Sequence, residues 1–120
     1  MIEAAGVVIP AHNEQDLLPS CLAAVRRAAR RVAVPVHLVV VADACTDLTA
    51  RLARDHGATV IAVDARNVGA ARRAGASHLL RRTRRLDPAA VWLATTDADT
   101  IVPRYWLAGS SATPTGAGTA

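Results

Sequence analysis

Lysine and phenylalanine are absent from this sequence, and its only aromatic residues are one tyrosine and two tryptophans. Proteins that bind single-stranded nucleic acids usually stack the bases on aromatic side chains, so we expect no nucleic-acid partner despite the formal net charge of +4. That charge is compatible with a phosphate-bearing ligand or an anionic surface. With so few aromatic side chains, alanine and valine must fill the core, which suits helices packed closely on a sheet.

Cysteine is scarce too, because Cys21 and Cys45 are the only two, and they have neither metal-ligand spacing nor the pattern of a disulfide framework. The N-terminus does not resemble a secretory leader. The longest apolar run, around 32–44, is interrupted by Pro35 and His37 and is too short to span a bilayer. We therefore expect a soluble, cytoplasmic protein with Cys21 as a small core residue. The sequence leaves a peripheral membrane contact open.

Apolar residues recur with the periods of strands and helices in alternation along the chain. Strands are expected at 6–9, 36–41, 59–63 and 91–95, and helices at about 14–32, 47–55 and 68–86, with a short helix at 103–106. This alternation predicts a mostly parallel sheet with helices on both faces, a Rossmann-like three-layer α/β sandwich. We expect residues 1–107 to form this single domain. The segment 108–120, rich in Gly, Ser, Thr and Ala, is expected to be a flexible tail.

Local signals indicate where the helices begin and end. Asn13 is suited to cap the first helix, with Asp16 as a weak capping-box partner, and Thr46 or Asp47 is suited to cap the second. Gly57 follows the expected end of the second helix. Arginines gather at the ends of the first and third helices, where cations interact favourably with the helix dipole. These arginines are Arg26, Arg27, Arg30 and Arg31, and Arg81, Arg82, Arg84 and Arg85.

Polar residues follow each of the four expected strands, at residues 10–14, 43–47, 64–69 and 96–99. The carboxyl ends of parallel strands lie along one edge of a sheet, where open α/β folds form their ligand crevices. If the fourth strand lies beside the first, the loop from His12 to Glu14 would face Asp97 and Asp99. The four clusters together predict a nucleotide crevice at this edge.

Asp97-Ala98-Asp99 places two carboxylates directly after an expected buried strand. Mg²⁺ is usually held by one or two carboxylates together with substrate phosphates, although a solvated turn with two acids is an equally ordinary reading of so short a pattern. The loop after the first strand contains no glycine, which excludes dinucleotide-type and P-loop phosphate cradles. A bound diphosphate would therefore be neutralised chiefly by a metal ion, with Asp99 as its anchor and Asp97 behind it.

Four motifs resemble those of family 2 glycosyltransferases of the GT-A fold, in the family's order and over about residues 6–107. They are Val7-Val8-Ile9-Pro10-Ala11-His12-Asn13-Glu14, Val40-Val41-Ala42-Asp43-Ala44-Cys45-Thr46-Asp47, Asn67-Val68-Gly69-Ala70-Ala71-Arg72 and Asp97-Ala98-Asp99. The resemblance implies transfer of a sugar from a nucleoside diphosphate, usually with inversion at the anomeric carbon. It implies a UDP-, GDP- or dTDP-sugar donor, an unknown acceptor, and Mn²⁺ or Mg²⁺ as cofactor.

The same resemblance implies roles for individual residues. Asp43 would accept a hydrogen bond from the base, most often uracil, and Arg72 would lie near the nucleotide. Asp97 and Asp99 would form the D-x-D motif, with Asp99 the favoured metal ligand and Asp97 in contact with both nucleotide and metal. Residues of the first motif would line the nucleoside pocket: Pro10, Ala11, Asn13 and Glu14.

This sequence also departs from the family pattern. The second motif usually has two adjacent acids followed by Gly-Ser, where this chain has Ala42-Asp43 and Ala44-Cys45. The family's acceptor half, with its general base, lies beyond the D-x-D, and no Asp or Glu follows Asp99 here. We therefore expect a truncated, donor-binding half with no catalytic base of its own, possessing little or no turnover alone.

Other interpretations have weaker support. Asp97-Ala98-Asp99-Thr100 is similar to the nucleophile motif of haloacid-dehalogenase-type phosphatases, but Ile101 replaces the expected Thr or Val and the motif follows the wrong strand. A sugar nucleotidyltransferase would need a glycine-rich first loop. A nucleotide-binding or interaction module without activity is the main alternative.

Histidines and further arginines carry no clear signal. His37, His56 and His78 share no spacing and are interpreted as surface or satisfied positions, and Arg66 is interpreted as solvated.

Overall fold

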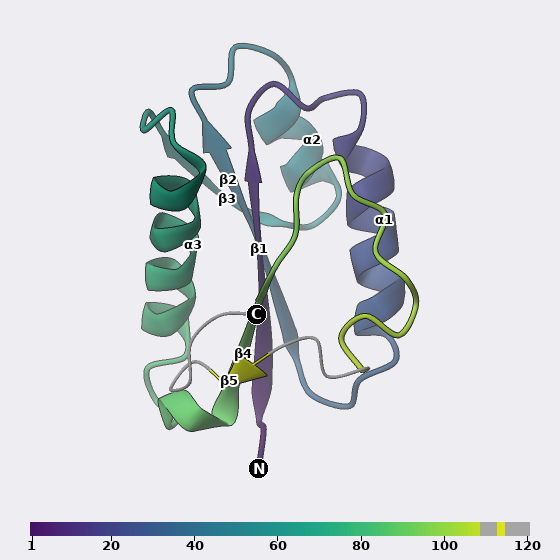
Figure 1. Ribbon diagram of the computed structural model, residues 1–120, viewed down its shortest axis with the longest axis vertical. Helices are drawn as coiled ribbons and strands as arrows, with labels where there is room; N and C mark the ends of the chain where they lie inside the picture. Colours follow the sequence, from purple (N-terminus) through teal and green to yellow (C-terminus); the bar gives the residue numbers. More distant parts are fainter. Residues whose placement is uncertain (109–112, 115–120) are drawn as a thin grey trace.

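Four parallel strands form the body of the sheet in the computed structural model, which describes residues 1–108 and 113–114. The strands are β1 (Ala4–Ala11), β2 (Val36–Asp43), β3 (Thr59–Val63) and β4 (Val91–Thr95), in the order β3-β2-β1-β4 (Figure 1). A two-residue strand, β5 (Thr113–Pro114), runs antiparallel to β4. All four predicted strands are confirmed, and β4 does lie beside β1, with Val8 opposite Thr95.

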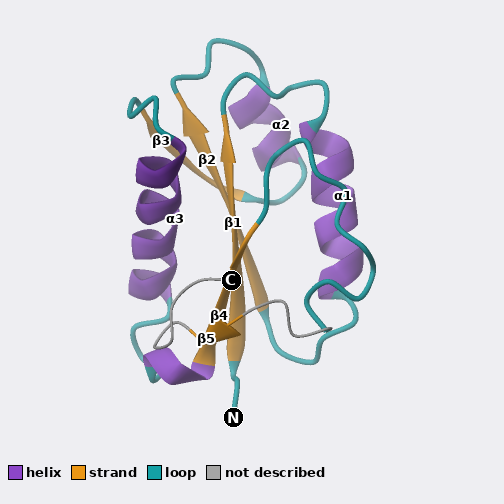
Figure 2. Cartoon of the chain, viewed as in Figure 1, coloured by secondary structure: helices purple, strands orange, loops and turns teal. Residues whose placement is uncertain are grey.

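The helices cover both faces of the sheet. α1 (Leu18–Ala29) and α2 (Thr49–Asp55) lie on one face and α3 (Val68–Arg82) on the other, as Figure 2 shows. A single 3₁₀ turn, η1 (Pro88–Ala90), leads into β4. The structure therefore confirms the predicted three-layer α/β sandwich.

Strand alternation divides the core into two layers, because successive side chains of a strand point to opposite faces. Val7 and Ile9 of β1 pack with the buried face of α1, including Cys21, which is fully buried as predicted. Val8 points the other way and packs with Ala71 and Leu79 of α3. The two layers hold the sheet edge that carries the polar loops in a fixed position.

Gly75 lets α3 lie close to the sheet. A Cβ at this position would overlap the side chain of Val8 and approach Val41 Cγ2 at 3.0 Å. A small residue is therefore required where the middle of α3 crosses β1 and β2, and this contact sets the position of the helix beside the candidate site.

The predicted cap of the first helix is wrong. α1 begins at Leu18 after Leu17, with no side-chain cap. Asn13 is instead in the left-handed region, with φ of 51°, and its Oδ1 accepts a hydrogen bond from the backbone N–H of Thr46 at 2.8 Å. The Asn13 side chain is thus used to join two loops, which makes it unavailable to the helix.

The second helix also begins later than predicted, at Thr49, with Leu48 as its cap residue. The Asp47 carboxylate still accepts a hydrogen bond from the backbone N–H of Thr49 at 2.9 Å. It thus binds the first residue of the helix although it lies one position before the cap residue. The end of this helix is as predicted, with Asp55 as the last residue and Gly57 in the left-handed region at φ 82°.

The third predicted helix was too long, and the fourth is absent. α3 ends at Arg82, not Leu86, and the Thr83 hydroxyl donates to the Leu79 carbonyl oxygen at 2.8 Å. Residues 103–106 form a turn closed by the Trp106 N–H and the Pro103 carbonyl, not a helix. Both errors occur where a hydrogen-bonded turn replaces a further helical turn.

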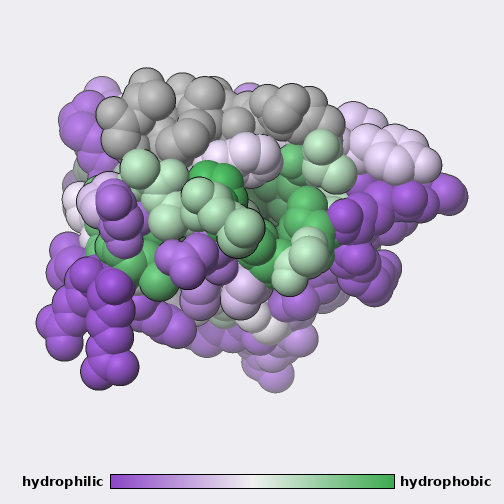
Figure 3. Space-filling view, turned by 90° about the horizontal axis from the view of Figure 1, so that it is seen from below, coloured by the Kyte–Doolittle hydropathy of each residue, from purple (hydrophilic) through white to green (hydrophobic). Residues whose placement is uncertain are grey.

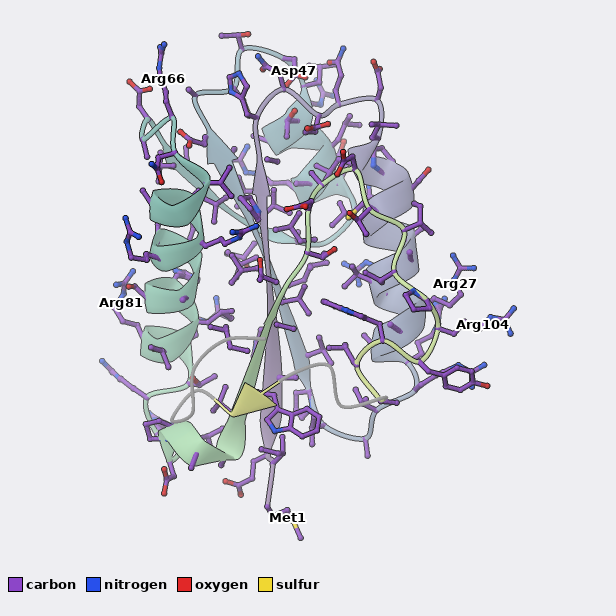
Figure 4. All side chains as sticks on the ribbon, in the orientation of Figure 1. Met1, Arg27, Asp47, Arg66, Arg81 and Arg104 are labelled. Atoms are coloured by element: carbon purple, nitrogen blue, oxygen red, sulfur yellow. The ribbon has the colours of Figure 1, made fainter. Side chains whose placement is uncertain are left out.

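The arginine clusters lie as predicted at the ends of helices. Arg27 in the last turn of α1 and Arg81 in the last turn of α3 point away from the molecule on opposite sides (Figure 4). Seen from below, apolar residues gather between groups of hydrophilic ones (Figure 3). Within the described residues, the helices are all too short or too polar to cross a bilayer. Apart from Ala108 and β5, the expected flexible tail 108–120 lies outside the described residues.

Candidate active site

The loops that follow β1, β2, β3 and β4 surround one cavity of about 590 Å³ at the carboxyl edge of the sheet. Because β4 pairs with β1, the loop after β1 lies next to the acid pair that follows β4. Among the described residues, the cavity is lined by Pro10, Ala11, His12, Glu14, Asp43, Arg66, Asn67, Val68, Ala71, Asp97, Ala98 and Asp99. The predicted crevice is therefore present, with the first loop and the two aspartates on its walls.

Six of the eight residues predicted for the site line this cavity: Pro10, Ala11, Glu14, Asp43, Asp97 and Asp99. The other two, Asn13 and Arg72, do not line it but contact residues of the same loops. Asn13 binds the loop after β2, as described above, and the Arg72 guanidinium lies 3.3 Å from the Asp97 carboxylate. The structure brings all eight to one edge, while their assigned roles stay predictions.

Asp43, the last residue of β2, organises the loop between β3 and α3. Its Oδ1 accepts the backbone N–H groups of Ala65 and Arg66, both at 2.8 Å, and its Oδ2 accepts that of Asn67 at 3.1 Å. These hydrogen bonds, led by that of Arg66, lower the pKa of Asp43 below its ordinary value against the opposing effect of burial. Asp43 is therefore a fixed negative charge on the cavity wall.

Asn67 continues this arrangement into α3. Its backbone is bound by Asp43, and its side chain caps the helix by accepting the Ala70 N–H at 2.9 Å. The motif that begins at Asn67 thereby places Val68 and Ala71 at the cavity and Arg72 at its rim. Asn67 was part of the predicted polar cluster, but its capping role was not foreseen.

The loops after β1 and β2 are tied together. Glu14 donates its backbone N–H to Thr49 Oγ1 at 2.9 Å, and Gln15 donates to Asp47 Oδ2 at 3.2 Å. Burial opposes ionisation of Asp47, but hydrogen bonds from Thr49 and Gln15 outweigh it and lower its pKa. The backbone of Glu14 and Gln15 is thus held by side chains of Thr49 and Asp47, and Glu14 lines the cavity.

Cys45 and His12 add to this contact. The Cys45 thiol donates to the Ala11 carbonyl at 3.4 Å and accepts the Asn13 N–H at 3.4 Å. His12 Nδ1 lies 2.8 Å from the Asp43 carbonyl oxygen, which fixes the exposed imidazole at the cavity.

Backbone strain is concentrated in these loops. The non-glycine residues with positive φ in the described chain are Asn13, Ala44 and Arg66, at 51°, 52° and 51°. One follows each of β1, β2 and β3. A left-handed conformation costs a residue with a Cβ about 1–2 kcal/mol, and such strain occurs preferentially at functional sites. The pattern agrees with the placement of the site at this edge.

The acid pair sits in a short turn after β4. The Thr100 N–H binds the Asp97 carbonyl at 3.1 Å, Ala98 is buried, and both aspartate side chains are exposed. The Cys21 thiol donates to the same carbonyl at 3.5 Å, and burial together with the nearby aspartates raises its pKa to about 11. Cys21 is therefore a neutral thiol that helps to hold the turn through this hydrogen bond.

No group of three or more His, Cys, Asp or Glu side chains in the described part of the chain is arranged to hold a metal ion. Asp97 and Asp99 instead offer two carboxylates on the wall of an open cavity. Such a donor set fits a hard divalent cation whose other ligands are phosphate oxygens and water. It does not fit a cation held by protein side chains alone.

Residues 6–109 match the family model described as glycosyl transferase family 2. This chain belongs to that family. No curated protein sequence matches it significantly. The family assignment agrees with the four motifs, which follow one another in the family's order and contribute residues to or beside one cavity.

Solved structures with the same fold include three glycosyltransferases. S. aureus TarS, residues 1–349, has a TM-score of 0.65 and 17% identity, with 92% of this chain covering 31% of that one. Mannosyl-3-phosphoglycerate synthase from Rubrobacter xylanophilus has a TM-score of 0.59 and 24% identity, with coverage of 89% and 34%. The third is glucosyl-3-phosphoglycerate synthase from Mycobacterium tuberculosis, in a complex with Mn²⁺, UDP and glucosyl-3-phosphoglycerate. It has a TM-score of 0.58 and 24% identity, and the match covers 89% of this chain and 37% of that one.

These likenesses show the fold of the family 2 chain. Its parallel strands, in the order β3-β2-β1-β4, match the N-terminal part of GT-A enzymes. The chain spans about a third of the length of the structures that it matches.

Six lining residues were not among the eight predicted for the site: His12, Arg66, Asn67, Val68, Ala71 and Ala98. Two of them, Arg66 and Ala98, show what the sequence could not indicate. Arg66, interpreted as solvated, lines the cavity, although its side chain is exposed and pairs with Asp64 at 3.1 Å. Ala98, the middle residue of the acid pair, is buried and also lines the cavity. Neither residue has a local sequence signal. Arg66, for example, is placed by the hydrogen bond from its backbone N–H to the Asp43 carboxylate, 23 residues away.

Proposed function

We propose that this family 2 chain is the donor-binding part of a metal-dependent glycosyltransferase. Its cavity would bind a nucleoside-diphosphate sugar, with UDP, GDP or dTDP as the carrier. The observation that carries the proposal is the meeting of four family motifs around one cavity whose wall bears Asp97 and Asp99. The acceptor is unknown.

The charge of the cavity explains the need for a cation. Glu14, Asp43, Asp97 and Asp99 line it, while Arg66 is the arginine among its lining residues. These carboxylates would repel a diphosphate unless a divalent ion lay between the diphosphate and the carboxylates. When bound, Mn²⁺ or Mg²⁺ supplies a Lewis acid that stabilises the departing diphosphate. Asp99, with Asp97, would hold that ion.

The remaining residues would hold the nucleoside. Pro10, Ala11 and Glu14 would form its wall, and the fixed carboxylate of Asp43 would accept a hydrogen bond from the base. The geometry of Asp43 supports this role. Backbone N–H groups of the loop after β3 hold both of its carboxylate oxygens in place, and the residue lines the cavity. A carboxylate has about four lone-pair sites, so it can accept a further donor.

Transfer with inversion also needs a base that takes the proton of the acceptor hydroxyl. No Asp or Glu follows Asp99 in this sequence. Because the chain spans about a third of the length of three structures that it matches, a nucleotide-binding module without turnover is a second candidate, and the acceptor side stays unassigned.

Isothermal titration calorimetry tests donor binding. The chain is titrated with UDP, GDP and dTDP in the presence of Mn²⁺, alongside Asp99→Ala and the control Asp55→Ala. Asp55 is an exposed acid at the end of α2, away from the cavity. We expect heat from at least one nucleotide, lost in Asp99→Ala and kept in Asp55→Ala. Absence of heat with all three nucleotides, or equal heat in both variants, would contradict the proposal.

An assay of sugar release or transfer from the bound donor tests whether the chain binds the donor without turning it over. Binding without turnover by the isolated chain supports the nucleotide-binding module or the donor-binding part alone. Robust transfer to an acceptor would show that the chain contains its own base, and the assignment of donor binding alone would be wrong.

A further inference from the structure

A second cavity, of about 160 Å³, lies at the opposite edge of the sheet from the candidate active site. It is lined by the first residues of β2 and β3 and by the last turn of α3. This cavity touches β2 from Val36 to Val39, whereas the nucleotide crevice touches β2 at Asp43, its last residue. The two cavities are therefore distinct.

Polar side chains converge on this cavity from three elements. On β2, His37 shares a face with Val39 and Val41, which pack under α3. On β3, Thr59 shares a face with Ile61, which packs in the same layer. The last turn of α3 contributes His78 and Arg82. These residues are four apart and so lie on the same side of the helix.

His78 has a polar atom that the described residues leave unsatisfied. Its Nε2 is buried and has no hydrogen-bond partner among them. A buried polar group without a partner costs about 1–3 kcal/mol, so native structures rarely leave one without a reason. His78 lines the cavity, and an oxyanion bound there would remove this cost if the ring rotated to bring Nε2 to it.

The local charge is positive. The Arg82 guanidinium makes no ion pair with any acid in the described part of the chain, and no acidic side chain lines the cavity. Burial, followed by the charges of Arg82 and Arg81, lowers the pKa of His78. The C-terminal end of α3 carries a partial negative charge that opposes an anion, so the charge of Arg82 has to outweigh it.

We propose that this cavity binds a small phosphate-type oxyanion between Arg82, His37 and His78, with the Thr59 hydroxyl as a further donor. Arg82 supplies the charge and a fork of N–H donors, and the imidazoles supply N–H donors that need an acceptor. The volume suits a small anion and not a nucleotide, since the nucleotide crevice has about 590 Å³. This site is independent of the proposed glycosyltransferase function.

Nuclear magnetic resonance of the histidine rings tests the site. Inorganic phosphate is titrated into the chain without divalent ions, and the ring signals of His78 are followed over pH. We expect a saturable shift of the His78 signals and a rise in its pKa, because a bound anion stabilises the imidazolium. A shift that fails to saturate, or one shared equally by the distant His12, would overturn the proposal.

Matched variants identify the residues involved. Arg82→Gln is expected to weaken phosphate binding about tenfold or more, since it removes a charge-assisted hydrogen bond. Arg81→Gln is the control, because Arg81 occupies the same helical turn without lining the cavity. Equal weakening by both variants would show a diffuse positive surface and overturn the assignment.

Two further arms complete the test. Asp99→Ala should leave the His78 response unchanged. A tighter response in this variant, which lacks a carboxylate that repels phosphate in the crevice, would place the phosphate there and overturn the proposal. Glycerol phosphate and acetate are titrated beside inorganic phosphate. Binding of the two phosphates with weak or absent acetate binding supports a phosphate-type site, whereas equal binding of acetate would contradict that chemical class.

Discussion

The guanidinium of Arg72 and the carboxylate of Asp97 lie 3.3 Å apart and join α3 to the turn after β4. The sequence assigns both residues to the nucleotide site, but it gives no sign of their contact with each other. The pair neutralises one of the two carboxylates that we propose for the metal ion. A cation bound at Asp97 must therefore compete with an arginine that the protein itself supplies.

Arg72→Ala should strengthen binding of Mn²⁺ to the nucleotide-free chain by about two- to fivefold. The side chains of Arg72 and Asp97 are exposed, and ion pairs of this kind contribute about 0.2–1 kcal/mol. Calorimetric titration with Mn²⁺ alone measures the effect. Arg73→Ala is the matched control, because Arg73 follows directly in α3 and has no acidic partner among the described residues. An unchanged or weaker affinity in Arg72→Ala would show that the pair does not compete with the cation.

Asp43→Asn should destabilise the chain at neutral pH and much less in acid. The carboxylate binds three backbone N–H groups, and its pKa is lowered in the folded state. Its contribution to stability is therefore complete above the ordinary aspartate pKa of about 3.9 and is lost as the pH falls through the lower folded value.

Urea unfolding from pH 7 to pH 3 measures the difference in free energy between wild type and Asp43→Asn. Asp64→Asn, an exposed acid in the same loop, is the control and should show little change at any pH. A difference that stays constant over this range would mean that the charge of Asp43 does not support the loop.

Ala44→Gly should stabilise the chain by about 0.5–1 kcal/mol. Ala44 has φ of 52°, and a left-handed alanine costs about 1–2 kcal/mol, part of which is offset by the greater freedom of glycine in the unfolded chain. The second motif of the family usually has glycine at this point, so the strain follows from a departure already visible in the sequence. Denaturant unfolding measures the change. Ala42→Gly, a buried position in β2, should have the opposite sign.

Gly75→Ala should destabilise the chain by up to about 2 kcal/mol, although alanine is the better helix former. Helix propensity favours the change by up to about 1 kcal/mol, but the added methyl overlaps Val8 and crowds Val41, and overpacking typically costs about 1–3 kcal/mol. Ser77→Ala, at an exposed position of α3, isolates the propensity effect and should be neutral or slightly stabilising. Equal stabilisation by both changes would show that α3 can shift away from the sheet without cost.

The sequence by itself determined the elements of this fold and the edge at which the site forms. The strands at 59–63 and 91–95 have the bounds that the sequence predicts, because each is a short apolar run between residues that end it. The parallel sheet follows from alternation with helices, and a parallel sheet brings the ends of its strands to one edge. The order of strands and polar clusters along the chain therefore places Asp43, Asp97 and Asp99 at the same edge, whereas their closeness also depends on β4 lying beside β1.

Tertiary structure decided which residues use one another as partners. Asn13 could cap a helix that begins at the next residue or bind Thr46, 33 residues away, and local pattern favours the first. Arg72 and Asp97 are 25 residues apart, and their contact exists only because β4 lies beside β1 and α3 packs closely through Gly75. Periodicity and capping act over about one helical turn, whereas these contacts depend on how whole elements pack, which no local signal encodes.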